Sequence, residues 1–363
     1  MSERPVRTIG ILGAGQLGRM LAVAASRLGL RTHVYAPDAD PIAAQVADVL
    51  TTASYSDAAA LAEFAAAVDV VTYEFENVPA EALDSLESQG VLLPRRNALT
   101  ISQDRLVEKD FLTGVGLTTA PYANVETNAD GVSAAERVGA PSIMKTRRLG
   151  YDGKGQVRVT RPEETVAAWE ELGKVPCVLE GFVDYRCEIS VIVARSHRGD
   201  VVCYEPGENR HRDGILRTTA VPAAISGAER SEAVNVATTV VESLDYVGVA
   251  GIELFVTTGG LVVNEIAPRV HNSGHWTQNG CPVDQFEQHV RSVAGWPLGD
   301  GRRHSDVVMT NLVGDDVLNA RELARDPALA LHLYGKAEVR PGRKMGHVNR
   351  IVGAAPPWRR DLV

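Results

Sequence analysis

Closely spaced cysteines, long apolar runs and an excess of positive charge are all missing from this sequence. The four cysteines, Cys177, Cys187, Cys203 and Cys281, show no C-x-x-C spacing, which argues against a disulfide framework or a zinc site. We expect buried, reduced thiols of a cytoplasmic protein. No apolar run approaches the roughly 20 residues that span a bilayer. The opening MSERPVR leads straight into an expected strand, without the apolar stretch of a signal peptide.

The charge balance excludes one class of partner. Lys and Arg number 37 against 46 Asp and Glu, a net charge of −9, so the chain is a poor candidate for wrapping nucleic acid. A local basic pocket for a small anion remains compatible with this total. With 363 residues, of which 45% are apolar, we expect a globular protein of two or three domains.

The first hundred residues alternate between strand and helix patterns. Apolar runs such as TIGILGA, RTHVYAP, DVVTYE and GVLLP are separated by the helical segments SDAAALAEFAAAV and VPAEALDSLES. Asp57 and Pro79 are helix-start signals. Repeated βαβ units predict a parallel sheet covered by helices, and we assign residues 1–100 to a Rossmann-like domain. Residues 101–298 form a second domain with antiparallel strands, and residues 299–363 a small C-terminal domain.

The segment GAGQLGRM, with Gly13, Gly15 and Gly18, follows the first strand and opens a helix. This is the dinucleotide-binding pattern, so an NAD- or FAD-dependent enzyme is one hypothesis. That class needs an acid at the end of the second strand, about 20 residues on, to bind ribose hydroxyls. Here Ala36 and Pro37 stand at that point. The strand-to-helix turn still predicts an anion site at a helix N-terminus.

A predicted hairpin over residues 252–266 is the most informative feature. A turn centred on Gly259 would place Glu253 opposite Glu265, with Phe255 and Val263 as the next facing pair. Like charges on facing residues are destabilising, so the pair suggests a cation between them. Carboxylate oxygens suit Mg²⁺ that bridges nucleotide phosphates. A solvated edge with both carboxylates in water is the alternative.

Two more segments fit a nucleotide site. The segment SIMKTRRLGYDGKGQVRV places Lys145 and a loop rich in glycine and cations between two strands, where backbone amides can cradle phosphate and the loop can close as a lid. It is not a P-loop, because Gly155 follows Lys154. In VLEGFVDYRCEISV, backbone groups near Glu180 could bind a base edge, and Glu188 could take ribose hydroxyls. Ordinary surface positions are the alternative for both acids.

These features occur in the order seen in the ATP-grasp superfamily. Five segments, GAGQLGRM, YEFENVP, GYDGKGQ, NEIAPRVHNSGHWT and GRKMGHVN, resemble the 5-(carboxyamino)imidazole ribonucleotide synthetase family of purine biosynthesis, over nearly the whole chain. The resemblance implies a pre-ATP-grasp domain, an ATP-grasp domain with a lid at about 118–185, and a C-terminal domain that completes the substrate site. One departure is Val270, which stands where the family pattern leads us to expect proline.

The resemblance also implies an activity and a set of site residues. The reaction would join 5-aminoimidazole ribonucleotide and bicarbonate with MgATP, through carboxyphosphate, in a homodimer with no nucleic acid or membrane partner. ATP would contact Arg105, Lys145, Gly150, Tyr151, Asp152, Gly153, Lys154, Gly155, Gln156, Glu180, Gly181, Phe182, Val183, Glu188, His211, Asn264 and Glu265. Two Mg²⁺ ions, for which Mn²⁺ can substitute, would bind Glu253 and Glu265. The ribonucleotide would contact Gln16, Glu76, Tyr151, Asp152, Lys154, Arg269, His271, Asn272, Ser273, Lys344 and Arg350.

Chemical roles follow from that assignment. Lys145, the metals and the loop would position and neutralise the transferring phosphoryl group. Arg269, beside His271, Asn272 and Ser273, would orient the bicarbonate-derived group. Histidine in a turn is more often a hydrogen-bonding scaffold than an acid or base, and both roles stay open for His271. The opening glycines would hold the single 5′-phosphate of the ribonucleotide, with Gln16 nearby.

Two alternatives remain within nucleotide-binding proteins. One is another ATP-grasp ligase, such as formate-dependent glycinamide ribonucleotide transformylase or a biotin carboxylase-like protein. The other is a nucleotide-binding regulator with an inactive site. The presence of both metal carboxylates, Lys145 and the loop glycines argues against decay of the site.

Overall fold

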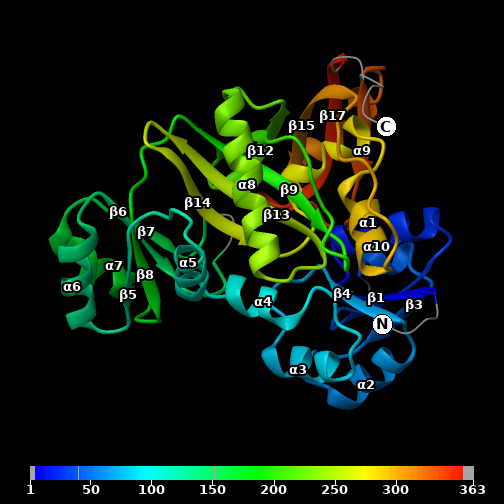
Figure 1. Ribbon diagram of the computed structural model, residues 1–363, viewed down its shortest axis with the longest axis horizontal. Helices are drawn as coiled ribbons and strands as arrows, with labels where there is room; N and C mark the ends of the chain where they lie inside the picture. The colour runs from blue at the N-terminus through cyan, green and yellow to red at the C-terminus, as the bar shows by residue number, and fades with distance from the viewer. Residues whose placement is uncertain (1–4, 40, 151–152, 355–363) are drawn as a thin grey trace.

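Three β-sheets organise the chain in the computed structural model, which describes residues 5–39, 41–150 and 153–354 (Figure 1). The N-terminal sheet lies at one side of the large central sheet, and a small sheet lies apart at the other end of the long axis. No helix among the described residues is long and apolar enough to cross a membrane. Cys177 and Cys281 are buried, as expected, whereas Cys187 and Cys203 are only half-buried.

The N-terminal sheet is parallel, as the alternating pattern predicts, with strand order β3-β2-β1-β4. Its strands are β1 (Thr8–Leu12), β2 (Arg31–Ala36), β3 (Val49–Thr52) and β4 (Val70–Tyr73). The helices around it are α1 (Gln16–Arg27), α2 (Ala58–Ala66), α3 (Ala80–Ser88), α4 (Arg96–Ser102) and the 3₁₀ turn at Ile42–Gln45. The expected strand at GVLLP is reduced to one bridge between Val71 and Leu92.

Helix starts in this part match the expected signals. The Asp57 side chain accepts a hydrogen bond from the Ala60 N–H, which caps α2. Pro79 precedes the first residue of α3. Asp104 likewise accepts from the Leu106 N–H and begins α5 (Arg105–Gly114), the helix that leads from the N-terminal part to the small sheet.

The small sheet is antiparallel, with strand order β5-β8-β6-β7, and corresponds to the expected lid. Its elements are β5 (Tyr122–Val125), α6 (Asn128–Val138), β6 (Ser142–Thr146), β7 (Gln156–Val159), a 3₁₀ turn (Pro162–Glu164), α7 (Thr165–Glu171) and β8 (Cys177–Gly181). A separate apolar cluster fills it, formed by residues such as Met144, Trp169 and Leu179. This unit therefore has its own core.

The central sheet has nine strands in the order β14-β13-β9-β11-β12-β15-β17-β16, with β10 paired to β9. Its strands are β9 (Cys187–Arg195), β10 (Val201–Cys203), β11 (Gly207–Arg212), β12 (Ile215–Val221), β13 (Gly248–Thr257), β14 (Gly260–Ala267), β15 (Ser305–Val313), β16 (Leu329–Leu333) and β17 (Lys344–Ala354). Pairing of β12 with β15 joins the C-terminal strands to the same sheet.

Helices cover this sheet and connect it to the N-terminal part. They are α8 (Gly227–Ser243), α9 (Thr277–Gly280), α10 (Gln285–Val293) and α11 (Ala320–Leu323), with 3₁₀ turns at Asn272–Gly274 and Gly314–Asn319. One apolar cluster contains Ala22 of α1, Ile192 of β9, Phe286 of α10 and Val307 of β15. The N-terminal, central and C-terminal parts therefore share a core, which fixes the residues of all three around one site.

Candidate active site

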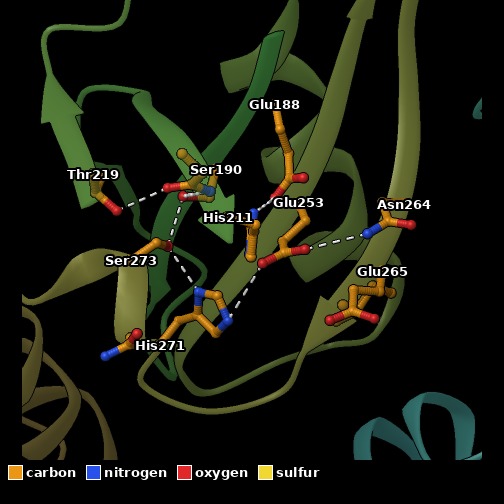
Figure 2. Close-up of polar contacts among 12 residues, drawn as sticks. Glu188, Ser190, His211, Thr219, Glu253, Asn264, Glu265, His271 and Ser273 are labelled. Carbon is orange, nitrogen blue, oxygen red and sulfur yellow. Dashed lines mark hydrogen bonds and ion pairs between the residues drawn. The ribbon is translucent and has the colours of Figure 1, made fainter. Parts of the chain in front are cut away.

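The β13–β14 hairpin places Glu253 directly opposite Glu265, as the sequence predicts. Both carboxylates lie on the face of the sheet toward α5, together with Glu188 of the neighbouring strand β9 (Figure 2). Glu253 is 7% exposed, so the alternative of two fully solvated carboxylates is wrong for this residue.

A β-bulge changes the pairing register of β13 and β14 between the carboxylate pair and the turn, so the prediction for the next facing pair is wrong. Phe255 faces Val262 rather than Val263, because the ladder shifts after the carboxylate pair and leaves Asn264 as the extra residue. Bulges re-aim side chains, and this one turns Asn264 toward Glu253. The Asn264 Nδ2 atom donates to Glu253 Oε2 at 3.2 Å (Figure 2). Three oxygen-bearing side chains therefore lie together at one end of the hairpin.

The pKa values of the three neighbouring acids, Glu253, Glu265 and Glu188, shift in different directions. Burial, reinforced by Glu265 and Glu188, raises the pKa of Glu253 well above its usual value. Burial also favours the neutral form of Glu265, but Arg105 and Lys145 outweigh it and hold the pKa of that carboxyl below its usual value. Burial and Glu265 raise the pKa of Glu188 to about 7. A cation at the pair would release a proton from Glu253, since metal ligands must be deprotonated.

Helix α5 supplies the counter-charge and a residue that the sequence pattern did not reveal. The Arg105 guanidinium lies 3.2 Å from Glu265, so it stands beside one of the two paired acids. Glu108, one turn further, is buried and accepts the Ile266 N–H at 2.7 Å. Burial and Glu265 raise the pKa of Glu108 to about 8. Glu108 thus fixes the strand at the residue that follows Glu265.

A buried cationic cluster faces this hairpin from the small sheet. Lys145 of β6 donates to Glu180 Oε2 of β8 at 2.9 Å, which brings together two predicted ATP residues. Lys109 of α5, also missed from the sequence, lies 3.4 Å from the same oxygen. Burial would raise the pKa of Glu180, but Lys145, Lys109 and Arg105 outweigh it and lower it. The second oxygen of Glu180 is buried and has no hydrogen-bond partner.

The glycine-rich segment is a hairpin loop between β6 and β7, as predicted. Gly155 has φ +72°, and a side chain there would clash with Thr146 Oγ1 at 2.7 Å. Gly150 lies near Arg105, since a Cβ at that position would stand 3.7 Å from its guanidinium. Gly153, Lys154 and Gln156 continue the loop into β7. The predicted site residues Tyr151 and Asp152 lie outside the described residues.

The remaining predicted nucleotide residues lie on the strands between these groups. Gly181 is the last residue of β8 and Phe182 follows it. Their N–H groups donate to the carbonyls of Pro121 and Pro141. Val183 follows, in the connection to β9. His211 Nδ1 lies 3.3 Å from Glu188 Oε1, which brings these two predicted ATP residues together. The predicted nucleotide residues therefore come from both the small sheet and the central sheet.

Arg269 joins the hairpin to the N-terminal domain. Its guanidinium lies 2.6 Å from Glu76, the acid expected in the substrate site. A second acid of the same segment, Glu74, was not predicted. Its carboxylate accepts the Gly15 N–H at 2.7 Å. Burial raises the pKa of Glu74, although the amides of Gly15 and Gly18 and the charge of Arg269 oppose it.

Glu74 corrects the interpretation of the opening glycines. We expected outward-facing amides that would hold a substrate phosphate, but the Gly15 amide is taken by a carboxylate of the chain itself. The three glycines leave room for it, because a Cβ at Gly13 or Gly15 would stand 3.0 Å or less from Glu74. The same contact argues against a dinucleotide, whose pyrophosphate would bind at this helix end. Gln16 is the first residue of α1 and directly follows Gly15, and its predicted contact with the substrate stays a prediction.

The turn after β14 holds the other predicted substrate residues. His271 Nδ1 lies 2.7 Å from Ser273 Oγ, and its Nε2 lies 3.6 Å from Glu253 (Figure 2). Burial, with Arg269 and Lys344 nearby, lowers the pKa of His271 well below its usual value. Asn272 instead exchanges hydrogen bonds with Asn311 of β15, at 3.0 and 2.6 Å, so its amide is engaged by the C-terminal part.

Gln285 anchors this turn and was missed by sequence reasoning. Its side chain accepts the His271 N–H and donates to the His271 carbonyl, at 2.9 and 2.8 Å. Val270, in place of the expected proline, is buried in the shared core. The turn is therefore held without the proline.

The two predicted cations of β17 differ in position. Lys344, at the start of the strand, lies close enough to Glu253 and His271 to influence the pKa of both. Arg350 lies six residues further, which corresponds to roughly 20 Å along a strand. It pairs with Asp326 at 2.7 Å and is about half exposed. Only Lys344 is brought to the carboxylates.

The donor set fits Mg²⁺ bound together with nucleotide phosphates. Among the described residues, no group of three or more His, Cys, Asp or Glu side chains converges as a metal cage. Mg²⁺ is commonly held by one or two carboxylates plus substrate phosphates, and Glu253 and Glu265 provide that pair. Burial first, and then the neighbouring Glu265 and Glu188, raise the pKa of Glu253, and a cation bound at the pair would favour its charged form.

Taken together, a small antiparallel sheet with a glycine-rich hairpin, facing a central sheet that carries paired acids, defines an ATP-grasp protein. Family models agree along the chain: a ribonucleotide synthetase preATP-grasp domain matches residues 6–103 and an ATP-grasp domain residues 110–286. A phosphoribosylaminoimidazole carboxylase C-terminal domain matches residues 307–355.

Known proteins narrow the class further. The chain is 52% identical to the N5-carboxyaminoimidazole ribonucleotide synthase of Brucella melitensis over 353 residues, covering 96% of this chain and 98% of that protein. The Thermus thermophilus synthetase structure is 43% identical with a TM-score of 0.89, covering 95% and 93%. An Aspergillus clavatus synthase in complex with ADP and 5-aminoimidazole ribonucleotide is 31% identical with a TM-score of 0.89, covering 96% and 94%. This chain belongs to the N5-carboxyaminoimidazole ribonucleotide synthase family of ATP-grasp ligases.

Proposed function

We propose that the chain carboxylates the exocyclic amine of 5-aminoimidazole ribonucleotide with bicarbonate, at the expense of ATP. The observation that carries the proposal is the position of Glu253. It faces Glu265, which pairs with Arg105 of the nucleotide side, and it also lies 3.6 Å from His271 of the expected substrate side. The phosphoryl group of ATP and the amine that accepts the carboxyl group could therefore both bind close to this carboxylate pair.

On the nucleotide side, the chain supplies positive charge and enclosure. Lys145 and Arg105 lie beside the acids and can neutralise phosphate oxygens once nucleotide replaces part of their present pairing. The loop between β6 and β7 can cover the phosphates and limit entry of water. Mg²⁺ held by Glu253 and Glu265 would neutralise charge on the transferring phosphoryl group.

The chemistry requires two group transfers. Bicarbonate oxygen attacks the γ-phosphorus of ATP, forming carboxyphosphate and releasing ADP. The amine nitrogen then bonds to the carboxyl carbon as the carbon–oxygen bond to phosphate breaks, and the proton of the amine passes to the departing phosphate. Arg269, fixed by Glu76, can orient the carboxyl group, and His271, in contact with Ser273 and Glu253, can fix the carboxylate pair beside it. Positioning of this kind contributes more to phosphoryl and carboxyl transfer than covalent help does.

For the 5′-phosphate of the substrate, Lys344 is the better-placed cation. It lies near the acids, whereas the Gly15 amide already binds Glu74. A phosphate at the opening glycines would have to displace that carboxylate.

We propose a homodimer as the assembly, which a measurement of molecular mass in solution would test.

An ADP-release assay with the ribonucleotide and bicarbonate tests the function. We expect turnover with these substrates; turnover only with formate and glycinamide ribonucleotide would instead support the transformylase alternative.

The matched variant is Glu265→Gln, with Glu136→Gln as control at an exposed residue of α6. Substituting a residue that hydrogen-bonds a metal ligand typically lowers metal affinity or activity about 10–100-fold. Loss of the ligand itself should therefore lower kcat by more than about 100-fold with the fold intact. Circular dichroism checks the fold. Near-normal turnover in Glu265→Gln would remove the carboxylate pair from the mechanism.

A further inference from the structure

A row of hydrogen bonds runs from the interior of the central sheet to His271, whose ring faces Glu253. It begins at Thr219 of β12, whose hydroxyl donates to Asn209 Oδ1 at 2.8 Å. The Asn209 amide nitrogen donates to Ser190 Oγ of β9 at 3.1 Å. These three side chains are buried, with 5% exposure or less, and none of them was predicted as a site residue.

The row continues across the turn after β14. Ser190 Oγ donates to Ser273 Oγ at 2.6 Å, and Ser273 Oγ lies 2.7 Å from His271 Nδ1 (Figure 2). On the other side of the ring, His271 Nε2 faces Glu253 Oε1 at 3.6 Å. Five consecutive contacts therefore connect the sheet interior to the carboxylate pair.

The amide of Asn209 gives this row a direction. An amide oxygen only accepts and an amide nitrogen only donates, whereas each hydroxyl has a single proton to give. Ser190 accepts from Asn209, so its proton goes to Ser273. Ser273 then has its own proton left for His271 Nδ1. A hydroxyl can also accept two hydrogen bonds, but among the described residues Ser273 Oγ contacts only Ser190 and His271. Its own proton is therefore satisfied only at Nδ1, and Nε2 carries the hydrogen.

We infer that Asn209 and Ser190 are positioning residues that hold neutral His271 in its Nε2–H tautomer, with Nε2 facing Glu253. This inference rests on the proposed function only for its consequence in catalysis. In that tautomer Nδ1 is occupied by Ser273 and Nε2 has no lone pair. His271 therefore orients the metal carboxylate and does not accept a proton from the substrate amine. Partners of this type orient metal ligands in many sites.

Nitrogen-15 NMR of the histidine-labelled protein, without substrates and at neutral pH, tests the tautomer directly. The His271 ring is identified by the signals lost in His271→Ala. We expect a pyrrole-type signal for Nε2 and a pyridine-type signal for Nδ1. Hydrogen on Nδ1, or an even mixture of tautomers, would overturn the inference. Because the measurement needs no turnover, its failure is distinct from failure of the proposed function.

Asn209→Asp provides the sharper variant. Aspartate has the same shape, but both of its oxygens accept, so Ser190 must donate to residue 209 and Ser273 must donate to Ser190. The His271 ring would then donate from Nδ1, and the tautomer should switch. Asn235→Asp, at an exposed position of α8, is the control and should leave the wild-type tautomer unchanged.

Kinetics supply a second readout in the same variants. We expect Asn209→Asp and Ser190→Ala to lower kcat about 10–100-fold while the KM for ATP changes little, as for other partners of a metal ligand. Ser190→Ala breaks the row without adding a charge, and it should produce a mixture of tautomers. An unchanged tautomer in both variants would contradict the inference even if activity fell.

Discussion

At the residue scale, Lys109 shows how a charge can be held inside this molecule. Its ammonium is nearly inaccessible, yet it lies beside Glu180, whose same oxygen also accepts from Lys145. Removing one partner of a buried ion pair is strongly destabilising, because the other charge loses its compensation. Here Lys145 remains, which limits the loss.

We predict that Lys109→Met lowers the free energy of unfolding by about 3 kcal/mol, at the lower end for a broken buried pair. Urea unfolding followed by circular dichroism measures it. Lys174→Met is the matched control, because the Lys174–Glu170 pair is largely exposed and should contribute less than about 1 kcal/mol. A loss for Lys109→Met no larger than that of the control would contradict the prediction.

The sequence could not reveal Lys109 or Glu108 as site residues. In RLVEKDFL, consecutive charges read as the solvated face of an amphipathic helix. Both are buried because α5 lies between β14 on one side and the small sheet on the other. Glu253 and Glu265 were predictable, because strand parity and one hairpin turn suffice to pair them.

At the scale of elements, His289 joins α10 to two sheets. Its Nδ1 accepts the Val249 N–H of β13 at 3.0 Å, so Nε2 carries the hydrogen and contacts Thr72 Oγ1 of β4 at 2.7 Å. Protonation of Nδ1 would break the first of these contacts. Burial accordingly lowers the pKa of His289 to about 4.

The sign of its effect on stability follows from this direction. The unfolded chain, with a pKa near 6.5, takes up the proton first, so the contribution of neutral His289 is fully present above pH 6.5 and is lost as pH falls toward 4. The loss amounts to about 3 kcal/mol. We predict that the stability difference between wild type and His289→Leu shrinks by this amount from pH 7 to pH 4.

Chemical unfolding at several pH values measures that difference, in which the contributions of other groups cancel. His304→Leu, at an exposed histidine, serves as the matched control. A difference for His289→Leu that stays constant across the range would refute the coupling.

Elements with strong periodicity or clear caps were predicted, and those without were not. The strands β1, β2 and β4, the helix α5 and the β13–β14 hairpin follow from apolar patterns and capping residues. The short strand β3 and the helix α6, with Gly131 in its interior, carry weak local signals. The bulge at Asn264 has no local signature, because packing around Glu108 and Glu253 selects it.

At the scale of the whole molecule, the small sheet stands apart from the body with its own core (Figure 1). Its glycine-rich loop nevertheless approaches the β11–β12 turn, since a Cβ on Gly153 would stand 3.3 Å from Gly214. Nucleotide phosphates between the two sheets would hold the loop in this position. Ligand binding to the closed form reduces the population of open forms by mass action.

We predict that saturating MgADP slows trypsin cleavage after Arg148 by about tenfold or more, because a ligand well above its Kd suppresses opening to that extent. The Arg148 side chain is 57% exposed without nucleotide. Mass spectrometry of the digest resolves the site, and cleavage after exposed Arg325 in the same sample is the internal control. Equal rates with and without MgADP at Arg148 would contradict a nucleotide-dependent closure.

The arrangement of the parts was only partly predictable. Local patterns separate the N-terminal, ATP-grasp and C-terminal segments, but pairing of β12 with β15 joins strands about 90 residues apart, for example Thr218 with Thr310. Neither strand carries a local signal for its partner. The Asn272–Asn311 exchange is hidden for the same reason, and so is the capture of Gly15 by Glu74.

One consequence of the sheet order concerns synthesis. β17 is inserted between β15 and β16, and Lys344, at its start, lies beside the carboxylates. A ribosome adds roughly 5–20 residues per second, so β13 and β14 emerge several seconds before the strand that brings this lysine. During that interval β15 has an open edge, which is a template for pairing with another chain. Nascent chains would therefore need protection of β15 until β17 docks.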